Sequence, residues 1–383
     1  MKHLKTIMLA TMFMLLIFPL TVSAAGNKYK TGAVIPSYEN TVTINIDPER
    51  FDRDFLEALD EAGEKASRTT QYKIIIPPGV YTIGHQYRVP SNTHIYARGA
   101  AVYADGTRTA VLMGAPDRKS ENIILEGGTW STAKQKAGTI IGAPFRFIGV
   151  KNLIMKDMTI KTNRKGHIIE VADMYGFTVE GCSISGNNLD SREPYLNIQP
   201  KEAIQLDVAT RVAVPGYGTT SNMYNGKGCH RVLIRNNKFY NCARGVGSHS
   251  YASGAEKRPY TYITVTGNVF KNLLAEAVHG QDWRDTTISK NTIEKCRQAG
   301  VYLYDAYNVR VTGNKVTDMR KYSGARKRNY DPKGKYGTGV LVRKSQNLLI
   351  DGNQFTKVYK AGVIQEDCRK ITEKGNKTRS IRK

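Results

Sequence analysis

Seven short segments of the chain place residues capable of acid–base chemistry at matching positions. They read HIIEVA, AIQLDV, GVGSHS, AVHGQD, GVYLYD, GVLVRK and GVIQED, and they begin at residues 167, 203, 245, 277, 300, 339 and 362. Each has the length and apolar content of a β-strand. Because side chains alternate along a strand, residues of one parity form a column when the segments are stacked.

Aligned on an inward apolar residue, the segments produce two outward columns. The first contains Glu170, Gln205, Gly247, His279, Tyr302, Leu341 and Ile364. The second contains Ala172, Asp207, His249, Gln281, Tyr304, Arg343 and Glu366. A solvent-facing strand surface carries mainly Lys, Glu, Ser and Thr, so this density of His, Tyr, Arg, Gln and Asp predicts a functional groove.

The chemistry that these residues favour is β-elimination of a uronic-acid polymer. His249 suits the base that removes the C5 proton, with Asp207 on the preceding strand to orient it and raise its pKa. Tyr304 is the predicted acid for the departing oxygen, or the base itself if a nearby cation lowers its pKa. Arg244 and His279 are predicted to neutralise the uronate carboxylate, which makes the C5 proton acidic.

A further set of residues is predicted to hold the sugar chain through stacking and charge. The set is Gln205, Gln281, Tyr302, Arg343, Lys201, Lys257 and Arg258. Long insertions flank the same segments and are expected to wall the groove. They cover residues 186–201, 209–228, 251–260 and 320–335.

Other functions stay open on the same residues. C5-epimerisation shares the first half of the elimination pathway. Hydrolysis needs two or three closely placed carboxylates, and the columns offer Asp207 with little near it. No cluster of acidic ligands appears, so the sequence predicts neither a metal site nor a cofactor, with calcium kept as an alternative. A non-catalytic protein that binds polysaccharide or the cell envelope is the alternative from another class.

A repeat of 23 residues positions the columns. The repeated residue is an asparagine, at Asn237, Asn268, Asn291, Asn314, Asn353 and Asn376, with extra residues in two of the intervals. This period fits a β-solenoid in which each coil stacks on its neighbours. We expect the asparagine amides to form a hydrogen-bonded ladder. The apolar residues two positions later are expected to form an inward stack: Phe239, Phe270, Ile293, Val316 and Phe355.

The N-terminal part of the chain supports the same architecture. Apolar residues at helical spacing predict an amphipathic helix over residues 51–66, which would cap the open end of the solenoid. Next come IIIPPGVYTI and NTHIYARGAAV, and then the coils marked by GN. This order resembles the pectate-lyase-like right-handed parallel β-helix superfamily, which includes polysaccharide lyases, uronan C5-epimerases, polygalacturonases and phage tailspikes.

The resemblance covers residues 37–376 and implies an all-β, single-stranded, right-handed parallel β-helix. The Asp-Pro-His motif of alginate epimerases and the Asp-rich signatures of polygalacturonases are absent, so no catalytic residue is carried over from a relative. We expect a signal peptide at 1–24, an N-terminal extension at 25–50, a catalytic β-helix at 51–376 and a basic tail at 377–383.

The start of the chain and its charge predict where the protein works. A basic start, an apolar stretch and Val22-Ser23-Ala24 indicate cleavage near Ala24 and secretion, with no integral membrane segment afterwards. The formal net charge is +24, or 24 − 2 = +22 once Lys2 and Lys5 leave with the signal. Outside the cell this charge favours an anionic polysaccharide, not nucleic acid, as the partner. The sequence makes no prediction of oligomeric state.

The cysteines predict neither a disulfide framework nor a zinc site. They are odd in number and lack CxxC spacing. The five are Cys182, Cys229, Cys242, Cys296 and Cys368. We expect Cys242 and Cys296 to be buried free thiols in one column.

Overall fold

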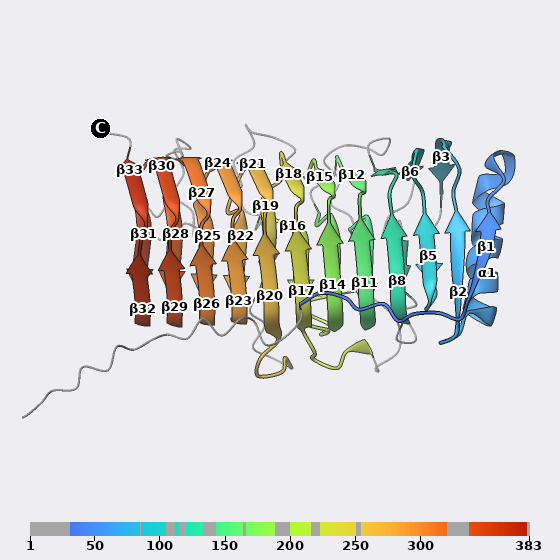
Figure 1. The fold of residues 1–383 in the computed structure, drawn as a ribbon, viewed down its shortest axis with the longest axis horizontal. Helices are drawn as coiled ribbons and strands as arrows, with labels where there is room; N and C mark the ends of the chain where they lie inside the picture. The colour runs from blue at the N-terminus through green and yellow to red at the C-terminus, as the bar shows by residue number, and fades with distance from the viewer. Residues whose placement is uncertain are drawn as a thin grey trace, which may run out of the picture. The chain divides into compact units, whose positions relative to one another are not determined.

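The computed structural model describes most of the chain as a stack of β-coils (Figure 1). The described residues are 31–84, 86–104, 112–114, 120–132, 143–163, 166–187, 200–215, 223–249, 254–319 and 337–380. Their strands form three parallel sheets, and each full coil gives one strand to each sheet. The parallel β-helix predicted from the sequence is confirmed.

The strands of the three sheets follow one another in a fixed rotation along the chain. The twelve-stranded sheet contains β1 (Asn40–Asn45), β2 (Thr70–Ile75), β5 (Thr93–Tyr96), β8 (Ser120–Glu126), β11 (Val150–Lys156), β14 (Met174–Glu180), β17 (Cys229–Arg235), β20 (Tyr260–Thr266), β23 (Trp283–Ser289), β26 (Tyr307–Thr312), β29 (Gln346–Asp351) and β32 (Arg369–Lys374). The eleven-stranded sheet contains β3 (Gly79–Ile83), β6 (Ala100–Ala104), β9 (Thr129–Ser131), β12 (Thr159–Lys161), β15 (Ser183–Ser185), β18 (Lys238–Tyr240), β21 (Val269–Leu273), β24 (Thr292–Cys296), β27 (Lys315–Met319), β30 (Gln354–Val358) and β33 (Lys377–Ser380). The ten-stranded sheet contains β4 (Tyr87–Val89), β7 (Leu112–Gly114), β10 (Phe145–Ile148), β13 (Ile169–Ala172), β16 (Glu202–Asp207), β19 (Arg244–Ser248), β22 (Val278–Gln281), β25 (Ala299–Tyr304), β28 (Thr338–Arg343) and β31 (Ala361–Glu366).

The helix α1 (Phe51–Lys65) closes the N-terminal end of the stack, after a short 3-10 turn, η1 (Pro48–Arg50). Its buried face packs on the first coil, where the Phe51 ring lies 4.2 Å from that of Tyr81 and the Phe55 ring lies 4.9 Å from that of Tyr87. Elsewhere in the stack, a neighbouring coil covers the apolar side chains of each coil. At this end the helix covers them instead. The predicted cap is confirmed.

The predicted asparagine ladder is also confirmed. Each Oδ1 accepts from the backbone N and from the Nδ2 of the preceding asparagine, as Asn291 accepts from Asn268 at 2.9 and 3.0 Å. Each Nδ2 also donates to a backbone carbonyl, which for Asn291 is that of Val265 at 2.9 Å. Beside the ladder, Phe239 and Phe270 stack with ring centroids 4.6 Å apart. The ladder therefore satisfies the polar groups of a buried turn at every coil.

A second ladder, which the sequence analysis missed, lies in the N-terminal coils. Asn122 donates from Nδ2 to Oδ1 of Asn92, and Asn152 donates to Asn122, both at 2.9 Å. These residues are 30 positions apart, so a search for the 23-residue period does not find them. The two coils between Asn92 and Asn152 are longer than the later ones, but the same amide-to-amide contact keeps them aligned.

Cys182, Cys229, Cys242 and Cys296 are buried free thiols, and Cys368 is a partly exposed one. Leu273 of the preceding coil pairs with Cys296 in the strand register. Burial raises the pKa of Cys242 to about 12. These thiols serve as small apolar side chains of the core.

The two outer boundaries of the solenoid differ from the prediction. β1 precedes α1 and pairs with β2 in register, so the first sheet begins inside the expected N-terminal extension. β33 pairs with β30 and lies within the expected basic tail. Each terminal strand extends an existing parallel sheet, which provides its backbone hydrogen bonds. The expected signal peptide falls outside the described residues, and within the described part no helix has the length and apolar content needed to cross a membrane.

Replacing Asn291 with alanine tests the ladder. The change removes four hydrogen bonds and leaves buried partners on both neighbouring coils without them. We expect the free energy of unfolding in urea to fall by about 2–4 kcal/mol. Asn45→Ala, at an exposed position of β1, is the control and should change it by less than about 0.5 kcal/mol. Equal losses in the two variants would contradict a structural role for the ladder.

Candidate functional site

The two predicted outward columns lie on the ten-stranded sheet. The register of the first is confirmed by the pairs Glu170–Gln205, Gln205–Gly247, Gly247–His279, His279–Tyr302, Tyr302–Leu341 and Leu341–Ile364. Its predicted exposure to solvent is wrong for most members, because Glu170, Gln205, His279, Tyr302 and Leu341 are buried. The second is confirmed by the pairs Ala172–Asp207, Gln281–Tyr304, Tyr304–Arg343 and Arg343–Glu366. His249 follows directly after the last residue of β19. Successive coils therefore bring these side chains to ~4.8 Å spacing along one face.

A third column of charged residues, which the sequence analysis did not recognise, lies beside the first. It consists of His167, Glu202, Arg244 and Glu276, each two residues before the inward apolar residue of its coil. Strict alternation would point these side chains inward. Near the start of these strands, however, the chain bends and two consecutive side chains enter the core. Ala203 and Ile204, for example, have no exposed area. The residue before them therefore faces the same side as the residue after them.

Glycine positions confirm this geometry. A Cβ added to Gly245 would lie 2.7 Å from the ring of Phe270, inside the core, whereas one added to Gly247 would lie 2.9 Å from Cγ of Glu202. Gly247 thus leaves space that the Glu202 side chain occupies. A sequence signal existed: a charged residue or a histidine stands directly before the two core residues in each of four successive coils.

Arg244 lies between two glutamates in the centre of this column. Its Nη1 donates to Oε1 of Glu202 at 2.6 Å, and its Nε donates to Oε2 of Glu276 at 2.8 Å. The exposed fraction of the side chain is 1% for Arg244, 0% for Glu202 and 8% for Glu276. The guanidinium predicted to bind a uronate carboxylate is therefore occupied by two carboxylates of the protein.

Three histidines surround this ion triad. Nδ1 of His167 lies 3.3 Å from Oε2 of Glu202, and Nε2 of His249 lies 3.5 Å from the same oxygen. Nδ1 of His279 lies 3.4 Å from Oε2 of Glu276. The six side chains form one buried group, the His/Glu/Arg cluster: His167, Glu202, Arg244, His249, Glu276 and His279.

The charges of the cluster are fixed by its neighbours. Burial opposes ionisation of Glu276, but Arg244 outweighs it and holds the pKa of Glu276 at about 2. Burial is likewise outweighed at Glu202, where His249 and Arg244 hold the pKa well below its ordinary value. Burial lowers the pKa of His167 to about 3. Both glutamates are therefore ionised near neutral pH, and the His167 imidazole is uncharged.

A carboxylate that the sequence analysis did not consider, that of Glu202, approaches His249 at 3.5 Å. Asp207 accepts from Nε2 of Gln205 at 3.0 Å and is 1% exposed. Burial, reinforced by the charge of Glu170, raises the pKa of Asp207 well above its ordinary value. Asp207 and Gln205 are therefore partners of each other inside the face.

A second feature of the face lies on β25 and β28. Tyr302, Leu341 and Ala299 form an apolar cluster separate from the core, and Tyr304 and Ile364 pack against it. The exposed Lys344 places Nζ 5.5 Å from the centre of the Tyr304 ring. We name Tyr302, Tyr304 and Lys344 the aromatic platform.

The aromatic platform adjoins the His/Glu/Arg cluster. The rings of His279 and Tyr302 lie 4.9 Å apart, and Nε2 of Gln281 lies 3.0 Å from Nε2 of His279. Arg343 is paired with Glu366 at 2.7 Å, so its charge is partly neutralised. The predicted acid, Tyr304, stands two coils from β19, or ~9.6 Å along the axis, too far for a hydrogen-bonded relay with His249.

The remaining predicted binding residues are basic and lie toward the edges of the face. Lys201 is half-buried and directly precedes Glu202, whereas Lys257 and Arg258 are exposed in the turn before β20. The predicted walls fall largely outside the described residues, at 188–199, 216–222, 250–253 and 320–336.

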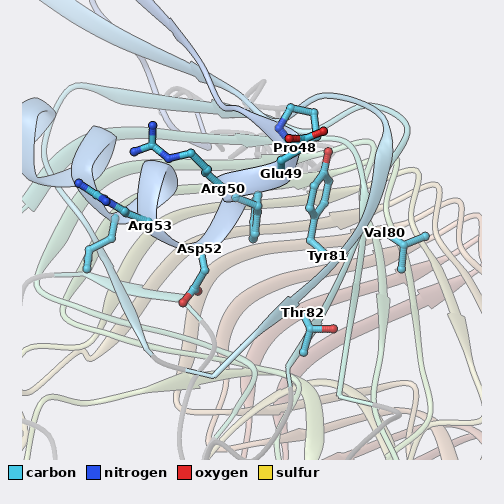
Figure 2. Close-up of a pocket in the computed structure, with 10 residues that line it drawn as sticks. Pro48, Glu49, Arg50, Asp52, Arg53, Val80, Tyr81 and Thr82 are labelled. Atoms are coloured by element: carbon cyan, nitrogen blue, oxygen red, sulfur yellow. The ribbon is translucent and has the colours of Figure 1, made fainter.

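A depression at the N-terminal cap is less suited to be the site. It is lined by residues 48–53, Leu56 and residues 80–82, on η1, α1 and β3 (Figure 2). Charged residues of the first helical turn are used in ion pairs along the helix, Arg50 with Asp54 and Arg53 with Glu57. No part of the ten-stranded sheet contributes to it.

Known proteins share this fold. Residues 219–378 match the family model described as a right handed beta helix region, which agrees with the predicted handedness. The chain is 25% identical over 303 residues to the plasmin and fibronectin-binding protein A of Streptococcus pneumoniae (strain ATCC BAA-255 / R6). The match covers 69% of this chain and 41% of that protein, so it spans less than half of the relative.

Two solved structures show the likeness of the fold. One is the surface protein and adhesin PfbA of Streptococcus pneumoniae, with a TM-score of 0.59, 18% identity, and coverage of 88% of this chain and 97% of that one. The other is an exopolygalacturonase of Thermotoga maritima, with a TM-score of 0.55, 12% identity, and coverage of 90% and 94%. At the level of the fold, the resemblance to the right-handed parallel β-helix superfamily is confirmed.

Glu276 gives the cluster a defined dependence on pH. Its pKa of about 2 in the folded protein lies below the ordinary value of 4.5, so its stabilising contribution is complete above pH 4.5 and is lost as the pH falls toward 2. A lowering of the Glu276 pKa from 4.5 to about 2 corresponds to about 3 kcal/mol of folding free energy. Between pH 4.5 and pH 2, we expect the free energy of unfolding, measured in urea, to fall further in the wild type than in Glu276→Gln. The expected difference between the two falls is about 3 kcal/mol. Glu57→Gln, in an exposed ion pair, is the control, and parallel profiles of wild type and Glu276→Gln would contradict the assignment.

Proposed function

We propose that this right-handed parallel β-helix binds an anionic, uronic-acid-containing polysaccharide along the outward face of its ten-stranded sheet. The observation that carries the proposal is the aromatic platform. Tyr302 and Tyr304 belong to an apolar cluster outside the core, and the exposed Lys344 lies beside Tyr304. The apolar faces of sugar rings stack on such tyrosines, and a neighbouring lysine pairs with a uronate carboxylate.

The axis of the solenoid favours a polymer over a small ligand. Polar and aromatic side chains stand along the axis at ~4.8 Å intervals, so an extended sugar chain would meet a row of partners. Gln281, Tyr304 and Arg343 stand on three consecutive coils of this row. The net charge of +24 favours an acidic polymer.

Binding without turnover fits the described residues better than the elimination favoured by the sequence. Arg244 is held by two glutamates and is therefore not available for a sugar carboxylate, and the Asp207 carboxyl group accepts a hydrogen bond from Gln205. The adhesin named among the relatives supports the binding class, while the exopolygalacturonase supports an acidic polysaccharide as the ligand. Surface location and export of this chain are part of the same proposal.

Tyr304 is the residue to test for binding. Titration calorimetry with polygalacturonate, alginate, hyaluronan and heparosan should show binding to at least one polymer and none to neutral dextran. We expect Tyr304→Ala to weaken it at least about fivefold, because buried aromatic contacts at binding surfaces are worth more than about 1 kcal/mol. We expect Lys344→Gln to reduce its dependence on salt.

Tyr307→Ala is the matched control. Tyr307 is 45% exposed on β26 of the twelve-stranded sheet, so its loss should leave affinity unchanged. Equal losses in Tyr304→Ala and Tyr307→Ala, or equal binding of dextran, would contradict the proposal.

β-Elimination is the second candidate, favoured by the contact between His249 and Glu202. A carboxylate 3.5 Å from an imidazole orients the ring, as a general base requires. If the protein is a lyase, uronate polymers will gain the ultraviolet absorbance of an unsaturated product, and His249→Ala will lower the rate by about 10²–10⁴-fold.

His230→Ala is the control for the elimination. His230 contacts Glu256 at 2.9 Å but lies on the twelve-stranded sheet, so its loss should leave the rate unchanged. Exchange at C5 in deuterated water without new absorbance would indicate an epimerase. Neither signal, with binding retained, would exclude both reactions and leave the binding proposal.

A further inference from the structure

Three potential metal-ligand atoms converge inside the His/Glu/Arg cluster. They are Nδ1 of His167, Oε2 of Glu202 and Nε2 of His249, and all lie within 4.8 Å of one another. They come from three successive coils of the ten-stranded sheet. The geometry points to a site for one divalent transition-metal ion of the zinc type, held by these three side chains.

The spacing of the ligand atoms fits such an ion. With bonds of about 2.0–2.1 Å, neighbouring ligand atoms of a tetrahedral zinc site lie about 3.3–3.4 Å apart. The oxygen of Glu202 lies 3.3 Å from the nitrogen of His167 and 3.5 Å from that of His249. The protein therefore holds these ligand atoms close to the separation that they would have in a tetrahedral zinc site.

Two of the ligand atoms are buried without a hydrogen-bond partner. These are Nδ1 of His167 and Oε2 of Glu202, and the Glu202 side chain has no exposed area. Their mutual distance of 3.3 Å is an ion-pair contact without hydrogen-bond geometry. Buried polar atoms in folded proteins nearly always have a partner, and an ion between them would provide one for both.

The surroundings hold the carboxylate in place. Oε1 of Glu202 accepts from Arg244 at 2.6 Å, which leaves Oε2 directed at the two imidazoles. Such outer contacts orient metal ligands and contribute to affinity. Two ionised glutamates share the single charge of Arg244, so the ion triad keeps a net negative charge that favours a cation.

The donor set selects the class of ion. Two imidazole nitrogens and one carboxylate oxygen suit zinc and related first-row metals, whereas calcium requires six to eight oxygen ligands. Three protein ligands leave a coordination position for water or a ligand oxygen. The site departs from the expectation of metal-free chemistry, and calcium, the ion kept open from the sequence, does not suit it.

Metal titration tests this inference directly. The full chain, prepared without a histidine tag and stripped with a chelator, is titrated with Zn²⁺ by calorimetry and with Co²⁺ by visible spectroscopy. We expect one equivalent of each ion, an intense tetrahedral Co²⁺ spectrum and a raised Tm with Zn²⁺. His167→Ala and His249→Ala should each weaken Zn²⁺ binding more than about 100-fold.

His94→Ala is the matched control. His94 contacts Glu126 at 3.0 Å on the twelve-stranded sheet, and among the described residues this His–Glu pair is not part of a three-residue group that could hold a metal ion. Its loss should therefore leave Zn²⁺ affinity unchanged. Circular dichroism shows whether each variant folds, and Glu202→Asp keeps the charge while shortening the ligand. That variant should weaken Zn²⁺ binding and still fold.

Three results would overturn the inference: no Zn²⁺ binding by the wild type, unchanged affinity in folded His167→Ala, or a Co²⁺ spectrum with thiolate charge-transfer bands. The last would place the ion on a cysteine. The readout is metal binding itself, so the result does not depend on whether the protein binds polysaccharide.

Discussion

Constant register between successive coils is the constraint on which the rest of this structure depends. Backbone hydrogen bonds of the parallel sheets align the coils, and the asparagine ladder fixes the same turn in each of them. Chain insertions leave at turns and return to the same register: Asn314 bonds to Asn353 across 39 residues as it does to Asn291 across 23. Residues distant in sequence therefore become neighbours at ~4.8 Å spacing.

The same constraint makes the electrostatics of each column cooperative. Two like charges on adjacent coils would repel by about 3–4 kcal/mol at an effective dielectric constant near 20. In the third column Arg244 separates two glutamates, and elsewhere Arg146 pairs with Glu170 at 2.6 Å. Cations on this face are thus largely used to balance anions stacked beside them. Binding of an acidic ligand then depends on the exposed basic residues, such as Lys344, that lie beyond the columns.

Much of the fold was predictable because a solenoid repeats a local pattern. The period of the asparagines, the inward apolar positions and the cap each required only residue types and spacing, and the structure confirms them. The two outward columns followed from alternation along a strand, as the pairing of Gln281 with Tyr304 shows. The same reasoning located the face that carries His249 and Tyr304.

The third column was not predictable by that reasoning, because alternation fails at the bend where Ala203 and Ile204 both enter the core. Counting from Ile204 then assigns Glu202 to the interior, so a carboxylate 3.5 Å from His249 was missed and Asp207 was chosen instead. The N-terminal ladder was missed for a related reason, since its period of 30 differs from that of the later coils. Both errors arise where the chain changes its local geometry while preserving coil-to-coil contacts.

The cluster and the platform occupy neighbouring coils, and His279 links them. Its Nδ1 contacts Glu276 of the cluster at 3.4 Å, while its ring lies 4.9 Å from Tyr302 of the platform. A polymer stacked on the tyrosines and running along the axis would next pass over the coils of His249 and Glu202, because register leaves no lateral offset between them. The partly exposed Tyr304 and the exposed Lys344 offer contact area, whereas the buried cluster supplies fixed charges whose field is weakly screened. One face of one sheet thus combines the aromatic platform with a preorganised electrostatic centre, and His279 contacts both of them.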